Sequence, residues 1–161
     1  MGQNALGTRR QQRFGKLGEK SIALYPTKID DRSGCFSGSA VEQDGTLYLY
    51  YTGVNYLEEN PEDINQCRND QFLAAQMMIS SDDGMTFDNV KRKKTVIPPI
   101  TEKQIGSKTN TRDPKVWRGK GQLWLGVGGS RLFRDGQSTT DEDGNRIVIA
   151  WARMPQAVDG K

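Results

Sequence analysis

The chain has 161 residues, of which 34% are hydrophobic, 27% charged and 8% aromatic, with 18 glycines. A chain of this length can form one domain with a modest core, and the glycine content indicates many tight turns, so we expect short strands rather than long helices. The 23 basic and 20 acidic side chains nearly balance, and the sequence pI of 8.9 lies below the value of about 9 that marks nucleic-acid-binding domains, so no nucleic-acid partner is expected.

The residue types narrow the chemistry and the compartment. No segment is apolar for long enough to span a membrane, and the N-terminus lacks the apolar core of a secretory signal, so we expect a cytoplasmic protein with no membrane partner. The chain has no histidine, and Cys35 and Cys67 do not have a metal-ligand spacing, so neither a metal site nor another cofactor is expected. Any hydrolytic chemistry would have to use carboxylates.

The chain begins with a polar segment and then a hairpin. Residues 1–21 are rich in Gly, Gln, Arg and Lys without an apolar period, so we predict a flexible arm there, followed by one domain over residues 22–161. The first predicted element is a β-hairpin over residues 36–51. Its two β-prone runs are joined by Asp44-Gly45, a pair that favours a tight turn because both residues tolerate positive φ.

The middle of the chain combines a loop, a strand and a basic turn. Residues 55–70 are polar and contain Pro61, which predicts a surface loop with room for a short helical turn. Residues 71–80, QFLAAQMMIS, are flanked by turn signals, which favours a buried strand over the helix that Leu, Ala and Met would also allow. The basic run at residues 91–94 is predicted to be a solvated turn rather than a phosphate-binding site.

A turn motif lies at residues 80–87. The text SSDDGMTF matches the pattern S-x-D-x-G-x-T-F, with Asp82 as its aspartate, and resembles the Asp-box turn of sialidases and other propellers. In such turns the aspartate and the hydroxyls hydrogen-bond their own backbone, and the aromatic residue packs beneath them. We therefore predict a structural hairpin turn here, not an active site.

The remaining strand signals complete an all-β pattern. Strands are predicted at residues 95–97, before two prolines, at 113–117 and 123–127 as a further hairpin, and at 146–151. The total is roughly eight strands, and turn signals recur about every 8 to 12 residues without alternating helices. The pattern predicts an all-β sandwich, barrel or propeller and does not choose among these three.

Three stretches carry a more specific resemblance. Residues 22–53 read IALYPTKIDDRSGCFSGSAVEQDGTLYLYYTG, residues 111–117 read TRDPKVW, and residues 147–161 read IVIAWARMPQAVDGK. In this order they are similar to the G-x-F-S-G-S-A segment, the R-D-P motif and the Arg-Met-Pro strand of glycoside hydrolase family 32, the β-fructosidases, especially the sucrose-6-phosphate hydrolases. The resemblance implies part of a five-bladed β-propeller, about two blades, with a pocket for a terminal fructosyl unit at the strand ends.

The resemblance also implies roles for four residues. Asp113 of the R-D-P motif would hydrogen-bond the fructosyl hydroxyls and stabilise an oxocarbenium-like transition state, while Arg112 would orient nearby carboxylates or hydroxyls. Phe36 would supply an apolar wall of the pocket, and the Ser37 hydroxyl would hydrogen-bond the sugar. Ordinary structural roles stay open beside these, namely a strand-end salt bridge for Arg112 and Asp113 and hairpin packing for Phe36 and Ser37.

Two motifs of the family are missing from this sequence. The family's nucleophile is an aspartate in W-M-N-D-P-N-G, and its general acid is a glutamate in E-C; neither motif occurs, and no glutamate precedes a cysteine. Residues 130–145 also stand where the family has a much longer stretch. We therefore expect a truncated, internally deleted β-fructosidase that binds a fructose-containing saccharide but is inactive alone, with open sheet edges that favour self-association.

Two alternatives to this interpretation stay open. A non-catalytic carbohydrate-binding or interaction module would keep the wall of the pocket without the chemistry, and the nucleotide sequence that flanks the reading frame would separate it from a fragment. A sialidase-like enzyme, suggested by the Asp-box text, would need an arginine triad and a Tyr-Glu nucleophile pair that the sequence does not display.

Overall fold

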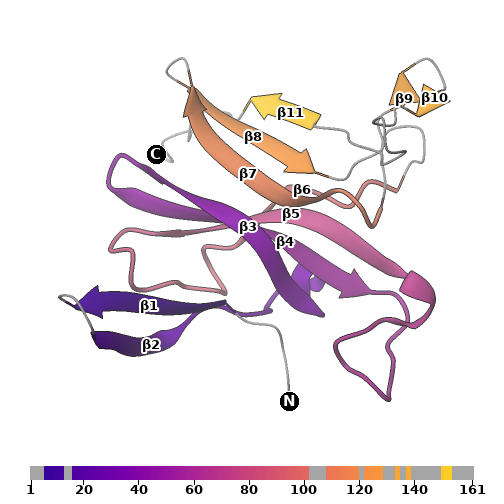
Figure 1. The fold of residues 1–161 in the computed structure, drawn as a ribbon, viewed down its shortest axis with the longest axis horizontal. Helices are drawn as coiled ribbons and strands as arrows, with labels where there is room; N and C mark the ends of the chain where they lie inside the picture. The colour runs from indigo at the N-terminus through magenta and orange to yellow at the C-terminus, as the bar shows by residue number, and fades with distance from the viewer. Residues whose placement is uncertain are drawn as a thin grey trace.

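The chain folds into antiparallel β-sheets (Figure 1). The computed structural model describes the backbone of residues 6–12, 16–101, 108–119, 122–128, 133–134, 137–138 and 150–153, and the side chains within 21–69, 71–101 and 108–117. The helical segments in this part of the chain are two single 3₁₀ turns, η1 (Ile29–Asp31) and η2 (Arg68–Asp70). None of the described helices has the length and apolar character needed to cross a membrane.

Two sheets make up most of the structure. The larger has four strands in sequence order, β3 (Gly34–Gln43), β4 (Thr46–Tyr56), β5 (Phe72–Ser81) and β6 (Lys94–Ile97). The second contains β7 (Arg112–Gly119), β8 (Gln122–Gly128) and β11 (Ala150–Arg153), with β8 in the middle. Separate hairpins pair β1 (Leu6–Gln12) with β2 (Lys16–Leu24), and β9 (Phe133–Arg134) with β10 (Gln137–Ser138).

Local turn chemistry explains the β3–β4 hairpin. Asp44 and Gly45 both have positive φ, 52° and 82°, which is the requirement of a two-residue hairpin turn. The predicted hairpin is therefore confirmed. The strand prediction for residues 71–80 is confirmed as well, because β5 pairs with β4 along its whole length.

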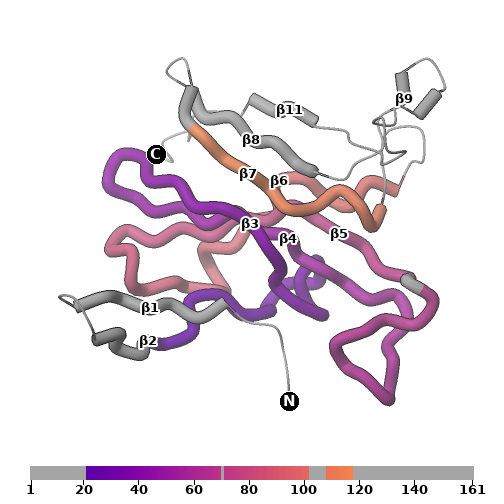
Figure 2. Tube along the Cα trace, viewed as in Figure 1, coloured from indigo at the N-terminus to yellow at the C-terminus, as the bar shows by residue number. Residues whose placement is uncertain are grey.

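Each face of the four-stranded sheet carries a cluster of buried side chains, and successive side chains along a strand point to opposite faces. Tyr51 and Met77 contribute to a buried cluster on one face, with Leu24 of β2. Tyr50, the neighbour of Tyr51, points to the opposite face and packs there with Val116 of β7. The trace in Figure 2 shows β7 running alongside β3, which places the second sheet against the first.

The Asp-box turn between β5 and β6 has the predicted structural role, with one change of residue. Asp83, not Asp82, accepts hydrogen bonds from the Ser81 hydroxyl and from the amide and hydroxyl of Thr86. These donors, the Thr86 amide first, lower the pKa of Asp83. Phe87 packs against the core beneath the turn. Asp82 instead pairs with an arginine at the surface.

A buried ion pair ties the segment before β3 to the segment before β6. The Asp31 carboxylate and the Lys93 ammonium lie 2.5 Å apart, and both side chains are fully buried. Asp31 also accepts hydrogen bonds from the Tyr51 hydroxyl and from the amides of Thr27 and Lys28. Burial by itself would raise the pKa of Asp31, but Lys93 and the other donors outweigh it, so the pKa lies below its ordinary value of 3.8.

The structure differs from the sequence-based expectations in three respects. Lys93 is buried, so the prediction of a solvated basic turn at residues 91–94 is wrong for its third residue. The backbone of residues 6–12 pairs with that of residues 16–24 as β1 and β2, strands that the sequence did not predict. A flexible arm over 1–21 and a domain over 22–161 stay predictions. Eleven strand segments are described against the predicted total of roughly eight, and most of the strand predicted at 146–151 lies outside the described residues.

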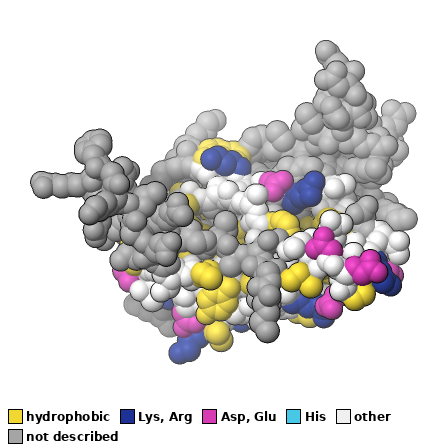
Figure 3. Space-filling model, turned by 60° about the horizontal axis from the view of Figure 1, so that its bottom comes forward, with side chains coloured by type: hydrophobic (Ala, Val, Ile, Leu, Met, Phe, Trp, Pro, Cys, Tyr) yellow, Lys and Arg dark blue, Asp and Glu magenta, His cyan; other side chains and the backbone are white. Residues whose placement is uncertain are grey.

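Charged side chains are mixed on the face shown in Figure 3. Basic and acidic groups lie near one another between apolar side chains on its described part, without a stripe of one sign. Exposed large apolar residues include Ile29 and Val90, at 64% and 62% exposure. Self-association through such surfaces and through the open edges of the sheets stays a prediction.

Removing Lys93 should destabilise the fold strongly. In Lys93→Met the Asp31 carboxylate stays buried and loses its counter-charge, and breaking a buried pair in this way costs about 3–5 kcal/mol. We expect urea unfolding at pH 7 to show a decrease of this size in the free energy of unfolding. Lys94→Met is the matched control, because Lys94 is exposed at the next position; equal losses in the two variants would contradict a special role for the pair.

The same pair predicts how stability depends on pH. A carboxylate whose pKa is lowered in the folded state stabilises the fold above its unfolded pKa, and that contribution is lost as the pH falls through the folded pKa. We expect the free energy of unfolding of the wild type to decrease below about pH 4. The difference in the free energy of unfolding between the wild type and Lys93→Met should become smaller as the pH falls over this range. Protonation of Asp31 removes the unpaired buried charge of the variant.

Candidate functional site

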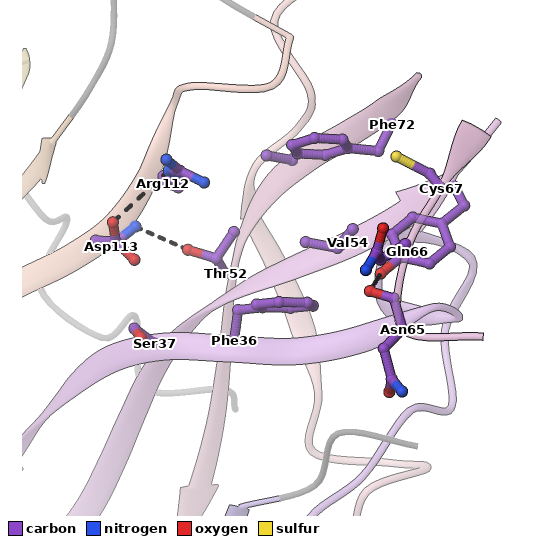
Figure 4. A pocket seen from close by; sticks show the side chains of 12 residues that line it. Phe36, Ser37, Thr52, Val54, Asn65, Gln66, Cys67, Phe72, Arg112 and Asp113 are labelled. Carbon is purple, nitrogen blue, oxygen red and sulfur yellow. Dashed lines mark hydrogen bonds and ion pairs between the residues drawn. The ribbon is translucent and has the colours of Figure 1, made fainter. Parts of the chain in front are cut away.

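A pocket of about 490 Å³ lies where β3, β5 and β7 begin and β4 ends (Figure 4). All four residues predicted from the sequence, Phe36, Ser37, Arg112 and Asp113, line it. They come from two different sheets, with the first two on β3 and the last two on β7. The fold therefore brings two sequence motifs, about 75 residues apart, to one cavity of the size that binds small molecules.

A β-bulge lies at each of the two motifs. The β3–β4 register shifts between Phe36 and Gly38, which makes Ser37 the extra residue, and the β7–β8 register shifts between Arg112 and Lys115. Bulges interrupt the alternation of a strand and re-aim side chains, and they are common next to active sites. Gly38 is required at the first bulge, because a Cβ there would lie 1.8 Å from the carbonyl oxygen of Tyr50.

Two polar side chains of the four-stranded sheet bind the backbone at the start of β7. Thr52 and Gln76 are directly opposite each other on β4 and β5, and both are buried. The Asp113 amide donates to Thr52 Oγ1 at 2.8 Å, and Gln76 Nε2 donates to the Thr111 carbonyl at 2.6 Å. The backbone on both sides of Arg112 is thus fixed by the first sheet.

Ser39 fixes the backbone on the other side of Asp113. Its hydroxyl donates to the Pro114 carbonyl at 2.9 Å and accepts from the Val116 amide at 2.8 Å, so β3 holds β7 through one side chain. Asp113 itself has φ of 59°, a conformation that costs a non-glycine residue of order 1 kcal/mol or more and persists only when its surroundings enforce it. The contacts from Ser39, Thr52 and Gln76, which we call the polar clamp, provide that enforcement.

The polar clamp leaves the functional groups of the two motif residues open to a ligand. The side chains of Arg112 and Asp113 are 52% and 58% exposed, and their Nε and Oδ2 atoms lie 3.8 Å apart. Such an exposed pair contributes little to stability. The carboxylate can accept hydrogen bonds from ligand hydroxyls, and the guanidinium can donate to them.

Sequence reasoning missed the rest of the lining. Val54 and Tyr56 follow Thr52 at alternate positions of β4, so all three side chains face the pocket, as strand periodicity requires once the strand is known. Gln66 and Phe72 come from the connection between β4 and β5 and from the start of β5. The alternation within LYLYYTGVNY is the one sequence signal that could have indicated Val54 and Tyr56. No local sequence signal marks Gln66 and Phe72.

Comparison with known proteins decides the family. The family model described as the glycosyl hydrolases family 32 N-terminal domain matches residues 15–139. The chain belongs to glycosyl hydrolase family 32. It is 34% identical over 119 residues to the sucrose-6-phosphate hydrolase of Bacillus subtilis, covering 74% of this chain and 21% of that protein, and 39% identical over 117 residues to the raffinose invertase of Escherichia coli, covering 72% and 21%.

Solved structures of family 32 proteins share the fold. A β-fructofuranosidase of Bombyx mori in complex with sucrose matches with a TM-score of 0.56 at 22% identity, covering 92% of this chain and 28% of that one. The sucrose-6-phosphate hydrolase of Lactobacillus gasseri matches with a TM-score of 0.54 at 18% identity, covering 85% and 25%. The all-β, partial propeller fold predicted from the sequence is thereby confirmed. This family 32 chain spans about a fifth of the length of the curated relatives it matches.

Ser39→Ala should loosen the attachment of β7. The variant leaves the Pro114 carbonyl and the Val116 amide without their partner, and an unsatisfied backbone group of this kind costs about 1–3 kcal/mol. We expect a decrease of this size in the free energy of unfolding, together with faster hydrogen exchange of the Val116 amide by NMR. Ser80→Ala on β5 is the control and should leave the exchange of the Val116 amide unchanged. Unchanged exchange at Val116 in Ser39→Ala as well would show that the Ser39 hydroxyl does not hold β7.

Proposed function

We propose that this family 32 domain binds the terminal fructosyl unit of a fructoside through Asp113, Arg112, Phe36 and Ser37. The observation that carries the proposal is the convergence of these four residues on one pocket. Two relatives of the chain are named for sucrose-6-phosphate and raffinose, which are both fructose-containing sugars. Asp113 would accept hydrogen bonds from fructosyl hydroxyls, Arg112 would donate to them, and the Phe36 ring would cover the apolar face of the sugar.

The second part of the proposal is that this chain alone does not hydrolyse the bound fructoside. Retaining hydrolysis uses two carboxyl groups about 5 to 5.5 Å apart, one as nucleophile and one as proton donor. Among the described residues that line the pocket, Asp113 is the one carboxylate. A single group cannot be ionised for attack and protonated for leaving-group departure at the same time, and the absence of a proton donor alone costs about 10² to 10⁴ in rate.

Binding and hydrolysis can be measured separately on the full chain. We expect isothermal titration to detect weak binding of fructose, and Asp113→Asn to weaken it about 10- to 100-fold, the value of hydrogen bonds to a charged group. Asp44→Asn is the matched control, because Asp44 also has positive φ but lies in the turn at the opposite end of β3. Equal binding by wild type and Asp113→Asn would exclude Asp113 from the site.

A reducing-sugar assay tests the absence of hydrolysis. The purified chain should release no fructose above the blank from sucrose, sucrose 6-phosphate or inulin. The reason is that no pair of carboxyl groups is assigned to act as nucleophile and proton donor. Release that is well above the blank and is lost in Asp113→Asn would show that other carboxylates of the chain supply those roles, and this half of the proposal would be wrong.

A further inference from the structure

The backbone of Asp113 is strained at the point where the proposed ligand would bind. Its φ is 59°, and the next residue in the chain is Pro114. A residue before a proline is restricted to extended backbone, with φ of about −120°, because the proline ring crowds it. The positive φ is therefore unfavourable both for the aspartate itself and for its place before a proline. Strained residues of this kind cluster at ligand sites and persist only where the surrounding structure enforces them.

The ladder between β7 and β8 does not hold this residue. Its register shifts after Arg112 and resumes at Lys115, so Asp113 stands in the bulge without a paired residue in β8. The side chain of Pro114 is fully buried, and a proline has no amide hydrogen, so packing holds the peptide plane that follows Asp113. The peptide plane that precedes Asp113 is held by the bond from its amide to Thr52 Oγ1, at 2.8 Å (Figure 4).

The hydroxyl of Thr52 is presented in a fixed place. Thr52 lies on β4 directly opposite Phe36 of β3 and Gln76 of β5, and it is 1% exposed. A β-branched side chain has few accessible χ1 rotamers, so little entropy is lost when the hydroxyl accepts the amide. Gln76 and Ser39, the other members of the polar clamp, bond the backbone of neighbouring residues. Within the polar clamp, Thr52 is the member that bonds Asp113 itself.

We propose that Thr52 is a positioning residue, whose hydroxyl holds Asp113 in its strained conformation and so keeps the carboxylate in the pocket. The inference rests on the proposed function, in which that carboxylate binds the fructosyl hydroxyls. Without the bond to Thr52, the backbone of Asp113 relaxes to the extended form that a residue before proline prefers. That change is a rotation of roughly half a turn about the N–Cα bond, and it moves the side chain to the other side of the preceding peptide plane, away from Arg112.

Thr52→Val tests the role of the hydroxyl, which it removes at nearly constant volume. We expect isothermal titration of the full chain to show about 10- to 100-fold weaker binding of fructose, because only the unrelaxed fraction of the molecules binds. Thr52→Ser keeps the hydroxyl and should bind fructose as the wild type does. Thr46→Val is the matched control, because Thr46 makes a side-chain hydrogen bond to Asp82, at 3.4 Å, at the other end of β4.

NMR reads the backbone of Asp113 directly and without a ligand. At positive φ the amide and α hydrogens of one residue lie closer together than in extended backbone, so the NOE between them is stronger. We expect a strong NOE within Asp113 in the wild type and in Thr52→Ser, and a weaker one in Thr52→Val. A weak NOE in the wild type would overturn the inference even if Thr52→Val did not fold.

The two measurements separate this inference from the proposed function. Wild-type affinity for fructose in Thr52→Val, with weak binding by Asp113→Asn, would keep the proposed function and overturn the role of Thr52. Equal losses of affinity in Thr46→Val and Thr52→Val would overturn it as well, because they would show a general effect of weakening β4. If the wild type does not bind fructose, the proposed function is wrong. In that case a weaker NOE in Thr52→Val would still support Thr52 as the residue that sets the backbone of Asp113, and an unchanged NOE would overturn both.

Discussion

The buried pair of Asp31 and Lys93 is the interaction on which the arrangement of the first sheet depends. Two charges without exposure to water are tolerated only when each has close partners, and here the carboxylate accepts from Tyr51 and from two backbone amides while the ammonium also donates to the Tyr25 carbonyl. The pair joins segments 62 residues apart and lies against β4. Burial raises the pKa of the neighbouring Cys35 thiol to about 12, so the cysteine stays neutral beside it. The path of the chain into β3 is thereby fixed, and with it the position of Phe36 and Ser37.

The polar clamp fixes the start of β7, in the second sheet, to the first sheet. Ser39, Thr52 and Gln76 each stand on a different strand of the first sheet and each bonds the backbone of residues 111–116 rather than a side chain. Backbone contacts of this kind set where the segment lies and leave the Arg112 and Asp113 side chains free. The unusual φ of Asp113 is then a result of packing between sheets and not of its own preference.

Local chemistry explains which features the sequence could predict. The Asp44-Gly45 turn and the Asp-box turn depend on residues within a few positions of one another, and both are found where the sequence placed them, although the acceptor is Asp83 instead of Asp82. The resemblance to family 32 located four residues that line the pocket, Phe36, Ser37, Arg112 and Asp113. Lys93 was predicted to be solvated because its partner, Asp31, is distant in sequence. A run of basic residues is expected to lie in solvent unless a buried carboxylate is known to face it. Gln66 was missed for a related reason, since a polar residue in a polar loop becomes informative only when the fold turns it toward a cavity.

In the proposed function, recognition of a ligand and hydrolysis place different physical demands on the pocket. Its shape follows from contacts among β3, β4, β5 and β7, so recognition of a ligand's hydroxyls requires only residues of these strands and of the connection between β4 and β5. Hydrolysis makes a stricter demand, because two carboxyl groups in opposite protonation states must flank one bond within a few ångströms. An exposed carboxylate beside an arginine meets the first demand and not the second. Asp113 is open to the hydroxyls of a ligand and has Arg112 beside it, but it is a single carboxyl group, and one group cannot act as nucleophile and proton donor at the same time.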